Sequence, residues 1–180
     1  YDEAAAAFAD VFGRQHAAVE AYRCEDADIV FVMIGSFASK AREAVDRLRD
    51  AGQAVGLVRP RLLRPFPAEH LLRLLAGKRG VAVIDQNISM GMGGVLHSEL
   101  SSALYGKPGA PAVLLSFIGG LGGRDITPEE FYEIAAVTRQ AAADGVVPPP
   151  RLLYTRDEVR EDTKLQAIAH TERNDLESGQ

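Results

Sequence analysis

The fold is decided by residues 81–106, whose sequence is VAVIDQNISMGMGGVLHSELSSALYG. The run from Val81 to Ile84 is apolar and partly β-branched, which predicts a short strand buried on both faces. A polar, glycine-rich turn follows. From Gly94 onward apolar residues recur at helical spacing until Gly106, a residue suited to the end of a helix. A strand, a glycine turn and a helix form half of a βαβ unit, and ligands or partners usually bind beyond the carboxyl end of such a strand.

The rest of the chain repeats this alternation of strand and helix. Apolar runs at 29–34, 54–58 and 112–118 predict further strands, and helices are expected between them. We expect Ser36 to cap one helix and Pro67 to be the first residue of another. Thr127, Pro128 and Glu130 predict a helix start with a capping box. The fold class is therefore α/β, with a mostly parallel sheet covered by helices on both faces in three layers.

Composition divides the chain into three parts. Residues 1–27 are predicted to be an N-terminal helical lead-in, because 2–24 are rich in alanine, with a break at Gly13. Residues 28–150 form the α/β domain. Residues 151–180 are a charged tail that is predicted either to be a helix lying on a neighbour or to be disordered. Because the chain begins at Tyr1 rather than Met, we expect it to be a domain of a longer subunit.

Charge and cysteine content exclude several classes of protein. The 180 residues carry a formal net charge of −5, which argues against a nucleic-acid groove. No apolar run is long enough to span a membrane and no signal peptide is evident, so no membrane partner is expected. The single cysteine, Cys24, excludes a disulfide framework and a cysteine-ligated iron–sulfur or metal site within the chain. We expect a cytoplasmic protein.

Two glycine-rich turns supply the candidate binding residues. Gly91, Gly93 and Gly94 lie between a predicted strand and helix, where N–H groups attract anions, but the spacing does not match a dinucleotide or Walker motif. Arg124 follows four glycines and could grip a carboxylate or phosphate. Each turn could instead pack against another chain, and Arg124 could pair with Asp125 or with a partner. Both turns are therefore weak candidates for an anion site or an interface.

The other reactive side chains do not form a catalytic set. Asp85 ends a strand, the usual position for a catalytic carboxylate, yet no base or nucleophile accompanies it. Ser36 and Ser89 lack the context of a nucleophile elbow. The histidines have no metal-ligand spacing, and the one nearest to a glycine turn is His97. A basic cluster could meet an anionic ligand or be solvated; it consists of Arg59, Arg61 and Arg64. We therefore predict no catalytic residue and no metal ligand.

An ordered series of motifs resembles one family. The motifs are YRCEDAD at 22–28, GS at 35–36, RPFP at 64–67, DQNISMGMGG at 85–94 and GGLGGRDITP at 119–128. Together they resemble the C-terminal domain of the alpha subunit of pyruvate:ferredoxin oxidoreductase and related 2-oxoacid oxidoreductases. The resemblance covers residues 1–150, and its last two motifs are the most specific. The family often has Phe where this chain has Met90 and Met92, a difference in packing more than in chemistry.

The resemblance implies a transketolase C-terminal-like fold with a five-stranded sheet. It also implies a multi-subunit oxidoreductase that uses thiamine diphosphate, Mg²⁺, iron–sulfur clusters and coenzyme A, with ferredoxin as the electron acceptor. The cofactors would be held by other domains or chains, and this domain would be a non-catalytic structural and interface element in a homo- or hetero-oligomer. Two alternatives stay open: the C-terminal domain of another thiamine enzyme, such as a transketolase or a dehydrogenase beta subunit, or a module that binds an anion such as coenzyme A.

Overall fold

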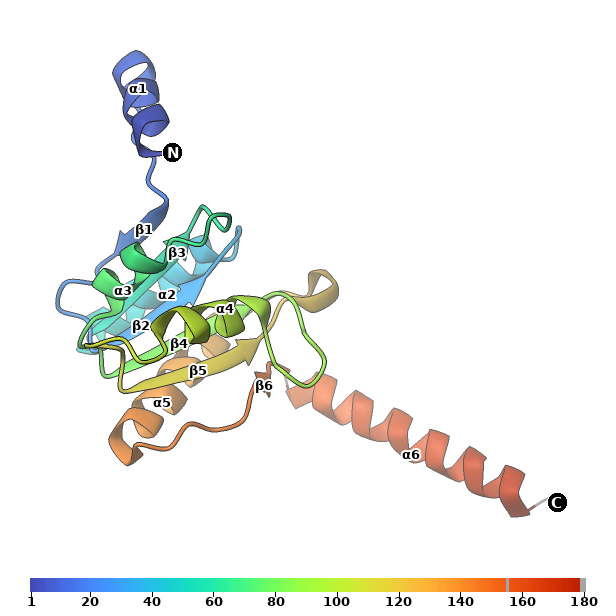
Figure 1. Ribbon diagram of the computed structural model, residues 1–180. Coiled ribbons are helices and arrows are strands. Elements are labelled where there is room, and N and C mark those ends of the chain that lie inside the picture. Colours follow the sequence, from blue (N-terminus) through green and yellow to red (C-terminus); the bar gives the residue numbers. More distant parts are fainter. Residues whose placement is uncertain (155, 179–180) are drawn as a thin grey trace.

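The computed structural model describes residues 1–154 and 156–178 (Figure 1). The strands are β1 (Val19–Tyr22), β2 (Ile29–Met33), β3 (Val55–Pro60), β4 (Gly80–Asp85), β5 (Val113–Ile118) and β6 (Arg151–Leu152). The helices are α1 (Asp2–Phe12), α2 (Ala38–Asp50), α3 (Ala68–Leu75), α4 (Val95–Leu104), α5 (Pro128–Asp144) and α6 (Arg156–Ser178), with a 3₁₀ turn, η1 (Leu121–Gly123).

One sheet has the strand order β1-β3-β2-β4-β5-β6. All of its pairs are parallel except β1 with β3, so the predicted mostly parallel α/β fold is confirmed. The resemblance implied five strands, and the sheet has six: the four predicted apolar runs are joined by β1 at one edge and by the two-residue strand β6 beside β5. The prediction of helix throughout 2–24 is wrong for Val19–Tyr22, since these residues pair with β3 across a gap in the sequence that no local pattern reveals.

Helices cover both faces of the sheet, as predicted. The side chains of α2 and α5 pack on one face, over Phe31, Ile84 and Phe117. The side chains of α3 and α4 pack on the other face, over Val30 and Val83. Strand β2 is buried along its whole length because it lies between these two layers, which explains why its sequence is uninterrupted by polar residues.

The helix ends follow the sequence in some places and not in others. The capping box of α5 is confirmed: Thr127 Oγ1 accepts from Glu130 N, and Glu130 Oε2 accepts from Thr127 N at 2.8 Å. The expected Ser36 cap is wrong, because α2 begins one residue later, at an N-cap Phe37 with no side-chain cap. Pro67 is the N-cap of α3 rather than its first residue.

The first and last helices lie away from the sheet. In Figure 1, α1 (blue) projects from the β1 side and α6 (red) projects from the β6 side. No residue of α1 is buried, and the helix ends at Gly13, whose φ is 65°. The charged tail is thus helical from Arg156 to Ser178, whereas Arg151–Leu152 form β6. The boundaries drawn at 27 and 150 stay predictions. Among the described residues, no helix combines the length and the apolar character needed to cross a membrane.

Replacing Thr127 tests the capping box. Thr127→Ala removes the acceptor for Glu130 N and is expected to lower the free energy of unfolding by about 1 kcal/mol. The matched control is Thr163→Ala, an exposed position within α6, where little loss is expected. Urea unfolding followed by circular dichroism measures both changes. Equal effects of the two substitutions would contradict a specific role for the cap.

Candidate functional site

The carboxylate of Asp85 lies at the centre of the sheet's carboxyl edge. Asp85 ends β4, and its side chain is fully buried. Its oxygens accept from Leu96 N at 2.9 Å and from His97 N at 3.1 Å, which are N–H groups in the first turn of α4. Asn87 Nδ2 donates to it at 3.2 Å. Burial raises the pKa of Asp85, and these three donors oppose the shift.

The glycines that follow Asp85 have two different structural roles. Gly91 and Gly93 have φ values of 78° and 85°, a left-handed conformation that side chains disfavour. Gly94 is different: its φ is −86°, and a Cβ added there would lie 2.0 Å from Asp85 Oδ2. Gly94 is therefore required for close approach rather than for an unusual backbone angle. The turn is closed by Ser89 N, which donates to Gly93 O at 2.7 Å.

These contacts bear on the anion interpretation of residues 91–94. The N–H groups at the start of α4 are the feature that would attract a phosphate. Here the N–H groups of Leu96 and His97 already donate to Asp85, and Val95 N donates to Asn87 Oδ1 at 2.9 Å. A phosphate would have to displace the protein's own carboxylate. The geometry therefore disfavours an anion at this turn and favours packing as its role.

A second side chain fills the neighbouring crevice. The chain reverses its direction across the sheet between β2 and β4, the position where open parallel sheets bind ligands. Gln86 occupies it: its Nε2 lies 3.4 Å from Ile34 O. A Cβ added at either Gly35 or Gly120 would lie 3.4 Å from the Gln86 side chain. Sequence reasoning missed Gln86 because nothing in its local pattern distinguishes it from any polar residue after a strand.

Arg124 pairs with carboxylates of the same chain. Its Nη2 lies 2.8 Å from Glu130 Oε1, and its Nε lies 2.5 Å from Glu158 Oε1 on α6. These two carboxylates hold the pKa of Arg124 above its ordinary value. The side chain of Asp125 pairs with Lys40 instead. Among the described residues, no hydrogen bond or ion pair joins Arg124 to the 91–94 turn, so the two predicted candidates are not brought together.

The predicted basic cluster is divided between two carboxylates, because Arg59 and Arg61 both pair with Glu20 and Arg64 pairs with Glu99. Arg61 Nη1 donates to Glu20 at 2.8 Å, whereas Arg64 donates to Glu99 of α4 at 2.7 Å. His97 is half-buried, and burial lowers the pKa of its ring. Cys24 is buried, which raises the pKa of its thiol. Over residues 1–154 and 156–178, no group of three or more His, Cys, Asp or Glu side chains is placed to hold a metal ion.

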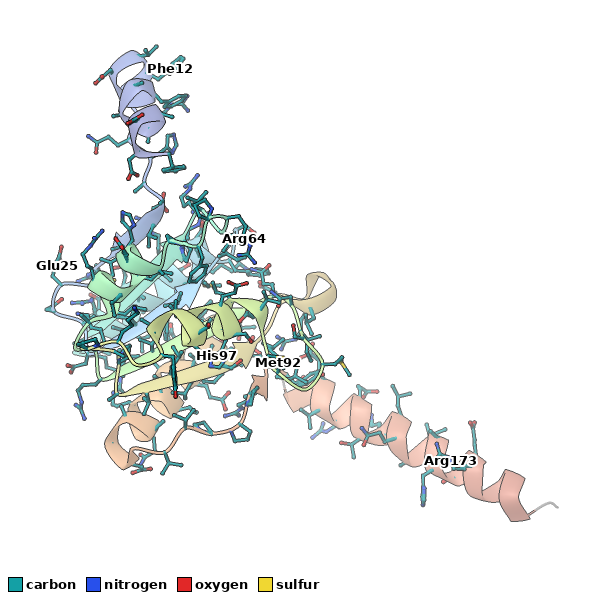
Figure 2. All side chains as sticks on the ribbon, viewed as in Figure 1. Phe12, Glu25, Arg64, Met92, His97 and Arg173 are labelled. Carbon is teal, nitrogen blue, oxygen red and sulfur yellow. The ribbon has the colours of Figure 1, made fainter. Side chains whose placement is uncertain are left out.

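The outer side of the glycine turn is apolar and exposed. Ile88, Met90 and Met92 are 47%, 88% and 66% exposed, and Val95 beside them is 43% exposed. Figure 2 shows Met92 on the turn that leads into α4, at the surface of the molecule. Apolar side chains that gather on one loop of a charged protein are typical of a contact surface. We call this set, Ile88, Met90, Met92 and Val95, the methionine turn.

The contact between Gly94 and Asp85 gives a test by double substitution. Gly94→Ala is expected to lower the free energy of unfolding by about 2 kcal/mol, because its Cβ displaces the carboxylate. In an Asp85→Ala background the space is vacated, and the added cost of Gly94→Ala should fall below about 1 kcal/mol. Urea unfolding of the four proteins of the cycle measures this. Additive effects would show that Gly94 and Asp85 do not interact as described.

Comparison with known proteins places this geometry in a family. The family model described as "Pyruvate:ferredoxin oxidoreductase core domain II" matches residues 27–131. The pyruvate synthase subunit PorA of Methanothermobacter thermautotrophicus is 47% identical over 131 residues, which are 73% of this chain and 33% of the relative. The chain therefore spans about a third of the length of the curated relatives it matches.

Two solved structures support the fold. One is "2-oxoglutarate:ferredoxin oxidoreductase from Magnetococcus marinus with 2-oxoglutarate, coenzyme A and succinyl-CoA bound", with a TM-score of 0.52 and 25% identity over 76% of this chain and 21% of that chain. The other is a split-gene transketolase, with a TM-score of 0.50 and 19% identity over 71% of this chain and 43% of that one. The transketolase-like fold is thus confirmed. The chain belongs to the family of pyruvate:ferredoxin oxidoreductase core domain II, as the motif series predicted.

Proposed function

We propose that this chain is a non-catalytic structural and subunit-interface domain of a thiamine-diphosphate-dependent 2-oxoacid:ferredoxin oxidoreductase alpha subunit, with pyruvate as the 2-oxoacid. Family membership and the name of the PorA relative support the enzyme class. The observation that carries the non-catalytic part is the filling of the carboxyl-end crevices by Asp85 and Gln86. A ligand that entered where parallel sheets usually bind one would find the chain's own side chains there.

An iron–sulfur cluster does not fit this chain, because such a cluster requires several cysteines and the chain has one, which is buried. Among the described residues, no group of three or more His, Cys, Asp or Glu side chains is placed to hold a metal ion. We therefore assign thiamine diphosphate, Mg²⁺ and the clusters to other domains or subunits of the holoenzyme. Coenzyme A enters the proposal as a co-substrate of the holoenzyme, and one solved relative has it bound.

The methionine turn is the surface that we assign to the contact with other domains or subunits. Its side chains are apolar and exposed, and methionine adapts its shape to irregular neighbours. Beneath the turn, Asp85 accepts hydrogen bonds from the start of α4, and these bonds hold the end of the turn in place. We propose that this contact keeps the catalytic parts in register, that ferredoxin reaches the enzyme through the holoenzyme, and that the assembly is cytoplasmic.

An assay of the separate chain tests the non-catalytic assignment. Pyruvate, coenzyme A, thiamine diphosphate, Mg²⁺ and an oxidised viologen dye are added to the chain alone and, in parallel, to the holoenzyme that contains it. We expect dye reduction by the holoenzyme and a rate equal to the buffer blank for the chain alone. Coenzyme A-dependent turnover by the separate chain would contradict the proposal.

A charge placed on the methionine turn tests the interface. The double substitution Met90→Asp and Met92→Asp is expected to weaken assembly with the other subunits at least tenfold, because a desolvated carboxylate in an apolar contact is costly. The control is Val146→Asp, which changes an equally exposed apolar residue on another loop and should leave assembly unchanged. Analytical size-exclusion chromatography of the holoenzyme measures assembly, and thermal unfolding checks each fold. Normal assembly of the double variant would refute this placement of the interface.

A further inference from the structure

A cavity of about 370 Å³ lies on the face of the sheet that α2 covers only in part. Its apolar floor is formed by Ala38 and Leu57, which belong to the core on this face, whereas Val19 and Ala21 also line it but alternate to the opposite face of the sheet. It opens beside the β1 edge, where the sheet extends beyond the helix layer. The rest of the lining is formed by Ala17, Glu20, Tyr22, Arg42 and Arg59. Of the residues that the sequence analysis singled out, Arg59 lines this cavity, whereas the proposed interface does not use it.

The guanidinium group of Arg42 is held in place by a contact that does not use its hydrogen-bond donors. Its Cζ lies 4.4 Å from the centre of the Tyr22 ring, a cation–π contact that uses the flat face of the group. Tyr22 is itself fixed, because its hydroxyl donates to Asp46 at 2.9 Å. Within the part of the chain that the structure describes, Arg42 makes no hydrogen bond and no ion pair. Its edge donors are therefore available to a ligand that enters the cavity.

Arg59 is a second guanidinium on this cavity, and it forms an ion pair with Glu20. It comes from β3, opposite Glu20 of β1 in the register of the two strands. Its Nη1 lies 3.6 Å from Glu20 Oε2, which is beyond hydrogen-bond length. The other oxygen of Glu20 accepts from Arg61 at 2.8 Å, so this carboxylate is shared. In the described residues, Arg59 donates no hydrogen bond, and two guanidinium groups thus face one cavity.

Charge and position both point to an anion here. The chain carries a net charge of −5, yet the described lining of this cavity has two arginines and a single carboxylate. The cavity lies at the carboxyl end of β3 and beside the start of α2, which is the side of a parallel sheet that binds ligands. The central crevices on that side are filled by Asp85 and Gln86, whereas this one is open.

We propose that this cavity binds a phosphorylated small molecule, with the phosphoryl group between Arg42 and Arg59 and a ring or apolar body on the floor. Guanidinium groups hold phosphate through paired charge-assisted hydrogen bonds, and Ala38 and Leu57 give an apolar body a place to pack. A nucleotide has both parts, and inorganic diphosphate has only the first. This inference does not depend on the proposed interface, since it involves different residues.

Calorimetric titration of the full chain with three probes tests the proposal. ADP is expected to bind more tightly than inorganic diphosphate, and adenosine is expected to bind at least tenfold more weakly than ADP. Arg42→Gln and Arg59→Gln should each weaken ADP binding by about tenfold or more, because each removes a charged hydrogen bond. Glu20→Gln should strengthen ADP binding, because the substitution removes a negative charge from the lining of the cavity.

The matched control is Arg47→Gln. Arg47 is exposed on the same helix and pairs with Glu43, outside the cavity, so its replacement should leave ADP binding unchanged. Circular dichroism and thermal unfolding confirm that each variant is folded. The proposal is overturned if neither ADP nor diphosphate binds saturably, or if Arg42→Gln and Arg59→Gln have no more effect than Arg47→Gln. Equal affinity for ADP and diphosphate would overturn the role given to the floor and identify the inorganic anion as the ligand.

Discussion

The structure depends on one buried carboxylate. Asp85 joins three parts of the chain that are otherwise independent: the end of β4, the turn at 88–94 and the first turn of α4. A charged group without partners would be too costly at this depth, so the two N–H groups of α4 and the amide of Asn87 are necessary to it. The carboxylate in turn satisfies N–H groups that no residue of the helix itself can reach.

Because of this arrangement, the surfaces that could bind a ligand or a partner lie away from the middle of the sheet. A parallel sheet offers its ligands a crevice at the carboxyl ends of the central strands, and in this chain Asp85 and Gln86 occupy that space. What stays accessible is the outside of the turn, where Met90 and Met92 are exposed, and the flank of the sheet near β1. Asp85 anchors the helix start behind the turn, and an anchored apolar turn loses less conformational entropy when it contacts a partner.

The sequence predicted the elements whose signals are local. Apolar runs predict the buried strands near Phe31 and Val83, and Thr127 with Glu130 predicts a helix start. Each of these patterns lies within a few residues of sequence. Strand β1 was missed because the contacts that support it come from distant parts of the chain, chiefly β3 about forty residues away, and its own four residues follow an alanine-rich helix. The partners of Arg124 were left open for the same reason, since Glu158 belongs to the separate tail helix.

The glycine turn shows why a motif can locate a site without stating its occupant. A phosphate loop and this turn need the same things: residues with positive φ, a backbone that comes close to an anion, and the N–H groups of a helix start. They differ in the source of the anion. Here the preceding strand ends in Asp85, and Gly94 leaves room for that side chain at a distance that no Cβ would allow. An acidic residue at the strand end therefore changes the meaning of the glycines that follow, because the protein brings its own anion to the helix and leaves no vacancy for another.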